Sequence, residues 1–139
     1  MAQRLRDVMT PNPVTCPVDA TLVEVARLMR DRDIGNVIVL EEDRLAGILT
    51  DRDIVVRAVA AERPFDTPIG EIVSRDVVAM APDDEVADAV QVMRERAIRR
   101  VPVVDGGRPV GIVSIGDLAV ERDPDSALAD ISASPPNND

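Results

Sequence analysis

Apolar residues recur at positions i, i+3, i+4 and i+7 in two separate stretches of the chain. The residues are Leu22, Val25, Ala26 and Met29 in the first stretch and Val86, Ala89, Val90 and Met93 in the second. This spacing places the four side chains on one face of a helix and therefore predicts two amphipathic helices. Thr21, with Glu24 three residues later, is expected to cap the first helix, and Asp84 is expected to cap the second.

Each predicted helix is followed by two continuous apolar runs that are joined by a polar turn. The runs are Val37–Leu40 and Leu45–Leu49 after the first helix, and Val101–Val104 and Pro109–Val113 after the second. Runs of this length are typical of strands that are covered on both faces. Pro102 has no backbone N–H, so it is expected at a strand start or at a sheet edge. A second helix is predicted after each pair of strands, from Asp51 to about Ala60 and from about Ile115 to Val120.

The two stretches are copies of one unit. A shift of 64 residues aligns residues 14–54 with 78–118 without a gap and gives 12 identical pairs in 41 positions. Average composition would give roughly 3 by chance. A unit of about 60 residues could not bury its strands alone, so we expect the two to pack sheet to sheet as one mixed α/β module. The predicted division is residues 7–61 for the first repeat, 62–70 for a connector, 71–122 for the second repeat and 123–139 for a disordered tail.

Composition and charge exclude several classes of function. The 139 residues include 16 Lys+Arg and 26 Asp+Glu, and the formal net charge of −10 argues against nucleic acid as a partner. There is no His and only one Cys, Cys16, which excludes Ser-His-Asp and Cys-His nucleophiles, Cys/His zinc sites and an intrachain disulfide. No apolar run approaches the roughly 20 residues that span a membrane, and no signal peptide is visible. We therefore expect a soluble, cytoplasmic protein without a membrane partner.

The motifs at the ends of the two copies point to a family. Each copy closes on a glycine-led segment, Gly47–Asp53 or Gly111–Asp117, and each begins with a related segment, Asp7–Thr10 or Glu71–Ser74. With these motifs, the repeated β-α-β-β-α unit resembles a pair of cystathionine-β-synthase (CBS) domains, which together form a stand-alone Bateman module. The resemblance implies a sensor module that is not an enzyme and that requires no cofactor. It also implies a regulated partner, and an adenine nucleotide (AMP, ADP or ATP) as a possible regulatory ligand.

The resemblance also implies two symmetry-related clefts, in which the Asp of each Thr/Ser-x-x-Asp motif holds the ribose hydroxyls. Cleft one would comprise Thr50, Asp53, Val78, Ile98, Arg99 and Arg100. Cleft two would comprise Val14, Ile34, Gly35, Asn36, Ser114 and Asp117. Because cleft two has no basic residue at its positions 35 and 36, we expect it to bind phosphate more weakly.

The residues support this chemistry independently of the resemblance. A carboxylate can accept two hydrogen bonds from a vicinal diol, and a hydroxyl at a helix N-terminus lies beside free backbone N–H groups that favour anions. Arginine supplies planar, charge-assisted donors to phosphate. The only dense basic stretch of this acidic chain comprises Arg94, Arg96, Arg99 and Arg100.

Simpler interpretations remain open at this point. Both Thr/Ser-x-x-Asp motifs can be helix caps and nothing more, and the arginines can be a solvated helix end. Gly35 can end the first helix, and Cys16 can be a core residue. The alternative function is a dimerisation or scaffold module without a nucleotide ligand. A homodimer is expected under either function, through the apolar residues of the second helices: Ile54, Val55, Val59, Leu118 and Val120.

Overall fold

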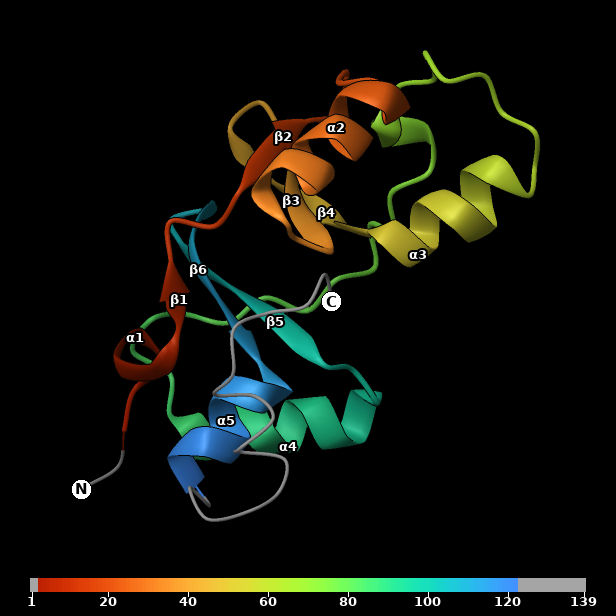
Figure 1. The fold of residues 1–139 in the computed structure, drawn as a ribbon. Coiled ribbons are helices and arrows are strands. Elements are labelled where there is room, and N and C mark those ends of the chain that lie inside the picture. The colour runs from red at the N-terminus through yellow and green to blue at the C-terminus, as the bar shows by residue number, and fades with distance from the viewer. Residues whose placement is uncertain (1–2, 123–139) are drawn as a thin grey trace. The chain divides into compact units, whose positions relative to one another are not determined.

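A computed structural model describes residues 3–122 of the chain. The predicted tail, residues 123–139, lies outside this described range. The two copies contain the same kinds of elements in the same order, as Figure 1 shows. The elements are α1 (Leu5–Val8), β1 (Thr10–Pro11), β2 (Thr15–Pro17), α2 (Leu22–Arg32), β3 (Asn36–Glu41), β4 (Arg44–Thr50), α3 (Asp51–Asp53), the π-helical η1 (Ile54–Val59), the 3₁₀-helical η2 (Ile69–Glu71), α4 (Val86–Arg96), β5 (Arg100–Asp105), β6 (Arg108–Ser114) and α5 (Ile115–Arg122).

The described residues form two compact units that do not follow the order of the chain. One unit consists of residues 14–77, and the other combines residues 3–13 with residues 78–122. Each contains one three-stranded sheet with its helices, so the fold is mixed α/β as predicted. We call them the 14–77 unit and the 78–122 unit, the latter including residues 3–13. No helix within residues 3–122 is long and apolar enough to cross a bilayer.

The sheet of the 14–77 unit has the strand order β2-β3-β4. β3 and β4 form an antiparallel hairpin, and β2 runs parallel to β3 with Cys16 opposite Val39. Beyond β4, Ser74 forms a single antiparallel bridge to Ile48. The segment that precedes the second copy in the sequence is therefore an edge of the first copy's sheet.

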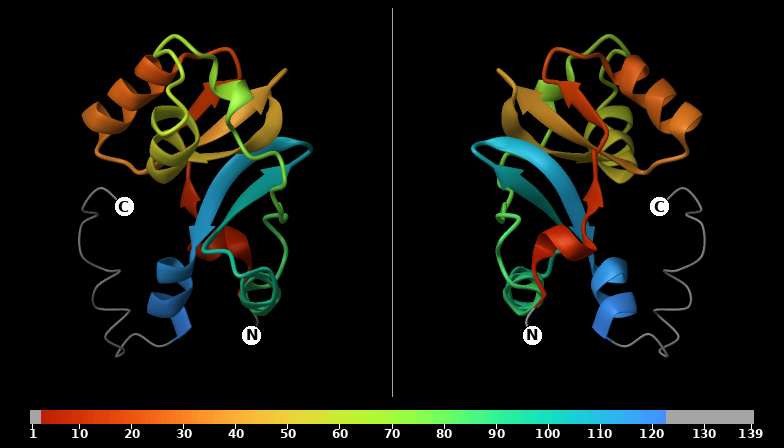
Figure 2. Two further views of the ribbon diagram at one scale, coloured as in Figure 1. Left: turned by 90° about the vertical axis from the view of Figure 1, so that its right-hand side faces the viewer. Right: turned by 90° about the vertical axis from the view of Figure 1, so that its left-hand side faces the viewer.

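The sheet of the 78–122 unit has the strand order β1-β6-β5. β5 and β6 repeat the antiparallel hairpin, with the same register irregularity after Val103 that β3 shows after Val39. The short strand β1 pairs with β6, placing Thr10 opposite Ile112. Figure 1 shows β1 in red beside the blue β6, and the additional views in Figure 2 show the same proximity. The start of the chain thus completes the sheet of the second copy.

The prediction for Pro102 is confirmed, because β5 lies at the end of its sheet. Its carbonyl accepts the Met80 N–H at 3.0 Å on the side of β5 away from β6. At the matching position of the first copy, the Ile38 N–H donates to the Val14 carbonyl at 2.9 Å. Pro102 has no N–H to offer. The second copy therefore has a single bridge at Met80 where the first copy has the strand β2.

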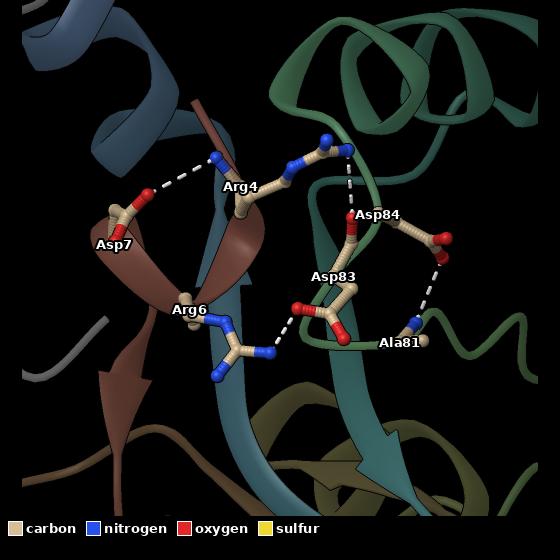
Figure 3. Close-up of polar contacts among 6 residues, drawn as sticks. All are labelled: Arg4, Arg6, Asp7, Ala81, Asp83 and Asp84. Atoms are coloured by element: carbon tan, nitrogen blue, oxygen red, sulfur yellow. Dashed lines mark hydrogen bonds and ion pairs between the residues drawn. The ribbon is translucent and has the colours of Figure 1, made fainter. Parts of the chain in front are cut away.

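Polar contacts hold the N-terminal helix α1 on the loop before α4, as Figure 3 shows. The Arg6 guanidinium donates to the Asp83 carboxylate, and the Arg4 guanidinium donates to the Asp83 carbonyl at 3.0 Å. The Leu5 N–H donates to the Asp84 carbonyl at 2.9 Å. The Leu5 side chain is fully buried in the core of the 78–122 unit. α1 is therefore an integral part of this unit.

Each unit has its own hydrophobic core, built from the apolar faces that the sequence predicts. Val25 and Met29 of α2 pack with Val37, Val39 and other strand residues in the 14–77 unit. The core of the 78–122 unit is made in the same way by α4, β5 and β6. Its buried members are Leu5, Val86, Ala89, Met93, Val101, Val103, Val113 and Leu118. Cys16 is buried in the first core, which confirms its interpretation as a packing residue.

The helix ends confirm one capping prediction and correct two others. The Thr21 hydroxyl accepts the Glu24 N–H at 3.2 Å, as predicted. Asp84 does not cap α4, because the helix begins one residue later than predicted and the Asp84 carboxylate instead accepts the Ala81 N–H at 2.8 Å. Gly35 does not end α2 either, since the left-handed residue after that helix is Asp33, with φ 55°.

Candidate functional site

The two Thr/Ser-x-x-Asp motifs adopt the same geometry at the same place in each unit. Strand β4 ends at Thr50 and β6 ends at Ser114, and a helix begins at the next residue. The Asp53 N–H donates to the Thr50 hydroxyl at 3.1 Å, and the Thr50 N–H donates to Oδ2 of Asp53 at 2.9 Å. Ser114 and Asp117 repeat both bonds at the same distances. Each motif is therefore a reciprocal helix cap, as the simpler interpretation proposes.

The capping bonds leave acceptor capacity on both carboxylates. A carboxylate has two oxygens with about four lone-pair sites. The backbone N–H of Thr50 or Ser114 occupies one site, on Oδ2. Asp53 and Asp117 are half-buried, so their remaining lone pairs stay accessible to an incoming donor. Capping and the binding of a diol are therefore compatible at either motif.

A second segment lies beside each motif within the same unit. In the 14–77 unit, Asn36 is the strand partner of Thr50, and the Gly35 carbonyl accepts the Asp51 N–H at 3.0 Å. In the 78–122 unit, Arg100 is the strand partner of Ser114. The Arg99 carbonyl accepts the Ile115 N–H at 2.8 Å. The strand that follows α2 or α4 thus begins next to the residue that caps α3 or α5.

The structure divides the predicted cleft residues between the units. The 14–77 unit contains Val14, Ile34, Gly35, Asn36, Thr50 and Asp53, and the 78–122 unit contains Val78, Ile98, Arg99, Arg100, Ser114 and Asp117. Each predicted cleft draws residues from both units. The assignment of Arg99 and Arg100 to the Asp53 cleft therefore stays a prediction. Within a single unit, these two arginines are neighbours of Ser114.

The two motifs differ in the charge of their neighbours. Arg99 is exposed and Arg100 is half-buried in the 78–122 unit, whereas the matching residues of the 14–77 unit are the uncharged Gly35 and Asn36. The neighbourhood of Asp53 contains a different cation, Arg57, whose Nε lies 3.9 Å from Oδ1 of Asp53. The sequence analysis did not single out Arg57. Its spacing of four residues from Asp53 on a predicted helix was the available signal.

The arrangement is suited to hydrogen bonding and not to metal coordination. Among residues 3–122, no group of three Cys, Asp or Glu side chains converges as a metal site would require. Burial raises the pKa of the Cys16 thiol, and the charge of Glu24 raises it further. A raised pKa opposes the thiolate form that both metal binding and nucleophilic attack require. The described residues therefore offer hydroxyl, carboxylate and guanidinium groups for recognising a ligand.

Comparison with a protein-family model identifies both copies. The CBS domain model matches residues 5–59 and 69–122, which together make up most of the chain. The CBS domain-containing protein YhcV of Bacillus subtilis is 40% identical over 132 residues, covering 92% of this chain and 94% of YhcV.

Two solved structures share the fold along most of their length. Hypoxic Response Protein I, crystallised with two coordinated zinc ions, has a TM-score of 0.78 and 35% identity, covering 86% of this chain and 98% of that protein. The Hypoxic response protein 1 sequences similar to this chain are from Mycobacterium tuberculosis. The CBS domain pair of protein MJ0100, in complex with 5-methylthioadenosine and S-adenosyl-L-methionine, has a TM-score of 0.75 and 29% identity, covering 86% and 94%. On the family match and these similarities, the chain belongs to the CBS-domain family and carries two CBS domains, one in each copy of its repeat.

Proposed function

We propose that the chain is a regulatory module that binds an adenine nucleotide at its two Thr/Ser-x-x-Asp motifs and signals its occupancy to a partner protein. CBS domain pairs are regulatory modules, and this chain consists of such a pair over most of its length. The proposal adds the class of ligand and the residues that hold it.

The observation that carries the proposal is the exact repetition of the carboxylate geometry. Asp53 and Asp117 are 64 residues apart in the sequence, and each is fixed by the same two backbone hydrogen bonds. Both keep free lone pairs that can accept the two hydroxyls of a ribose. Fixing a carboxylate before the ligand arrives lowers the ordering cost of binding.

Charge supports a ligand with phosphate. A chain with a net charge of −10 repels polyanions unless a local patch reverses the sign. Arg99 and Arg100 provide such a patch where β5 begins, beside Ser114. The adenosine-containing ligands of the MJ0100 domain pair support the adenosine part of the proposal.

The alternative function is a scaffold module whose motifs bind nothing. The observation that favours it is that the hydroxyl and the carboxylate of each motif already satisfy one another in a helix cap. Under this function, the repetition of the motifs would reflect helix capping alone.

A thermal-shift experiment distinguishes the two functions. We expect AMP, ADP or ATP at about 100 times its dissociation constant to stabilise the fold by roughly 2.7 kcal/mol. This gain corresponds to a rise in Tm of roughly 10 °C for a chain of this size. S-adenosylmethionine and adenosine serve as further ligands. If none of them shifts the Tm at millimolar concentration, the nucleotide proposal is wrong and the scaffold function takes its place.

Matched variants assign the site. Asp53→Asn and Asp117→Asn remove a charge but keep an oxygen that can accept the capping N–H. Asp51→Asn is the control, because Asp51 is exposed in the same first turn and contacts only the Arg52 N–H. Each variant is compared with its own ligand-free Tm. The proposal requires that Asp53→Asn or Asp117→Asn lose the ligand-induced shift while Asp51→Asn keeps it.

We also propose self-association through the helix that follows β4. Val55, Val56 and Val59 expose 58%, 53% and 59% of their surface on η1. The predicted interface changes at two positions, because Ile54 packs partly against the core of its unit and Leu118 is buried. The Val120 side chain lies outside the described residues. Light scattering that gives about twice the 15.0 kDa chain mass, and one chain mass for Val55→Asp with Val59→Asp, supports the dimer.

A further inference from the structure

Arg57 contacts two parts of the 14–77 unit at once. Its Nη1 donates to the backbone carbonyl of Ile72 at 3.2 Å, and its Nε lies 3.9 Å from Oδ1 of Asp53. Oδ1 is the carboxylate oxygen that the helix cap leaves free, since the Thr50 N–H uses Oδ2. A single side chain thus joins the candidate ligand-binding carboxylate to the backbone of a distant segment.

The segment that Arg57 contacts is packed closely into its unit. Ile69, Ile72 and Val73 are buried in the core of the 14–77 unit. The Ile72 and Val73 N–H groups both donate to the Ile69 carbonyl, at 3.0 and 2.9 Å. Ser74 then bridges to Ile48. Three residues after Ser74 the chain passes into the 78–122 unit. Residues 69–74 are therefore the last part of the 14–77 unit before that passage.

The second copy has the same components without the arginine. Asp117 corresponds to Asp53 and Val8 to Ile72, but the residue 64 positions after Arg57 is Glu121. A glutamate carboxylate cannot donate to a backbone carbonyl, and it repels a neighbouring aspartate. The connection is thus specific to the first copy, although the helix caps of the two copies are identical.

We propose that Arg57 couples ligand binding at Asp53 to the segment of residues 69–74. This inference rests on the proposed function, because it assigns a regulatory output to the same site. A ribose hydroxyl that donates to Oδ1 of Asp53 competes with Arg57 for that oxygen. The displaced guanidinium alters its hydrogen bond to the Ile72 carbonyl, so occupancy of the site changes the stability of residues 69–74. Arg57 is a positioning residue in this scheme and does not contact the ligand.

The first test needs no ligand. Hydrogen exchange is measured at the Ile72 and Val73 amides in the wild type, Asp53→Asn, Arg57→Gln and the double variant. We expect Asp53→Asn to change these rates at least threefold in the wild-type background and less than 1.5-fold in the Arg57→Gln background. Asp51→Asn is the charge-matched control, and the amides of β3 report any global loss of stability. Equal effects of Asp53→Asn in both backgrounds would overturn the coupling.

The second test adds AMP at saturating concentration to the wild type and to Arg57→Gln. We expect AMP to bind both proteins with affinities that differ less than fivefold, as measured by calorimetry. The exchange rates at Ile72 and Val73 should respond to AMP in the wild type only. An equal response in Arg57→Gln would contradict the coupling. If AMP does not bind the wild type, the proposed function fails, and the ligand-free test still decides whether Arg57 connects Asp53 to residues 69–74.

Discussion

The carbonyl oxygen of Ser74 occupies the position that a side chain at Gly47 would need. A Cβ built on Gly47 overlaps this oxygen, and it also comes within 2.9 Å of Cγ2 of Val73. Gly111, at the matching position of the second copy, lies in the same way against Met9 and the Thr10 carbonyl. The absence of a side chain at these two glycines lets the segments before each copy pack onto the strands β4 and β6.

The two glycines predict substitutions of unequal severity. Gly47→Ala places a methyl group against a backbone carbonyl, which can move only with residues 72–74. We expect a loss of about 3 kcal/mol or slightly more in the free energy of unfolding, at the upper end of overpacking costs. Gly111→Ala first meets the flexible Met9 side chain, so its cost should be about 1–2 kcal/mol. Urea denaturation measures both, and an equal or reversed order would contradict this reading of the two contacts.

Ala97 predicts a stabilising substitution. It ends α4 in the left-handed conformation, with φ 54°, and its side chain is exposed. Glycine adopts this conformation without the steric cost that a Cβ imposes. We expect Ala97→Gly to raise the free energy of unfolding by about 0.5–1 kcal/mol and the Tm by a few degrees. Ala26→Gly, at an exposed position inside α2, should lower it by a similar amount, about 0.5–1 kcal/mol.

The N-terminal helix predicts that one buried side chain matters more than the ion pairs around it. Leu5 is fully buried in the 78–122 unit, and Leu5→Ala should cost about 2–5 kcal/mol. The Arg6–Asp83 pair is largely exposed, so Arg6→Ala should cost at most about 1 kcal/mol, and less in high salt. Thermal unfolding of both variants tests this. A Leu5→Ala protein as stable as the wild type would show that α1 contributes little to its unit.

Cys16 predicts a loss of stability at alkaline pH. Burial, and secondly the charge of Glu24, raise the pKa of its thiol in the folded protein. As the pH rises from the unfolded pKa toward the raised folded pKa, only the unfolded chain loses the proton. The linked free energy therefore favours unfolding increasingly over that window. Cys16→Ala should show a shallower decline in Tm above pH 8 than the wild type, each measured against its own Tm at pH 7. Parallel declines would mean that other groups cause the alkaline loss.

The periodic parts of the structure could be predicted from the sequence because periodicity reports burial directly. The stripe that contains Val25 and Met29 packs into a core, and the apolar run from Val37 forms a buried strand. The 64-residue offset carries both features to the second copy, and even the register irregularities after Val39 and Val103 coincide. Local pattern thus determined the elements and their order.

The partners of the short segments could not be predicted in this way. Asp7–Thr10 and Glu71–Ser74 are four residues each, too short for a period that would reveal what they pack against. Their partners are determined by space beside Gly111 and Gly47, which is a property of the folded sheet. The end of α2 shows the same limit, since Asp33 adopts the left-handed conformation although a glycine is only two residues away.

The candidate site was predictable as chemistry and less so as connections. Thr50 with Asp53 and Ser114 with Asp117 were identified from their repetition, and their caps are in place. Arg57 was not identified, because its hydrogen bond to Ile72 joins residues that only the fold brings together.

The place of residues 3–13 in the 78–122 unit has a consequence during synthesis. These residues leave the ribosome first, but their partner strand β6 is not complete until residue 114, about 100 residues later. At about 5–20 residues per second, the N-terminal segment waits on the order of 5–20 s for its sheet. Residues 14–77 are contiguous and can fold during that interval. The earliest part of the nascent chain is thus among the last to be ordered, and for those seconds Leu5 is an apolar side chain open to chaperones.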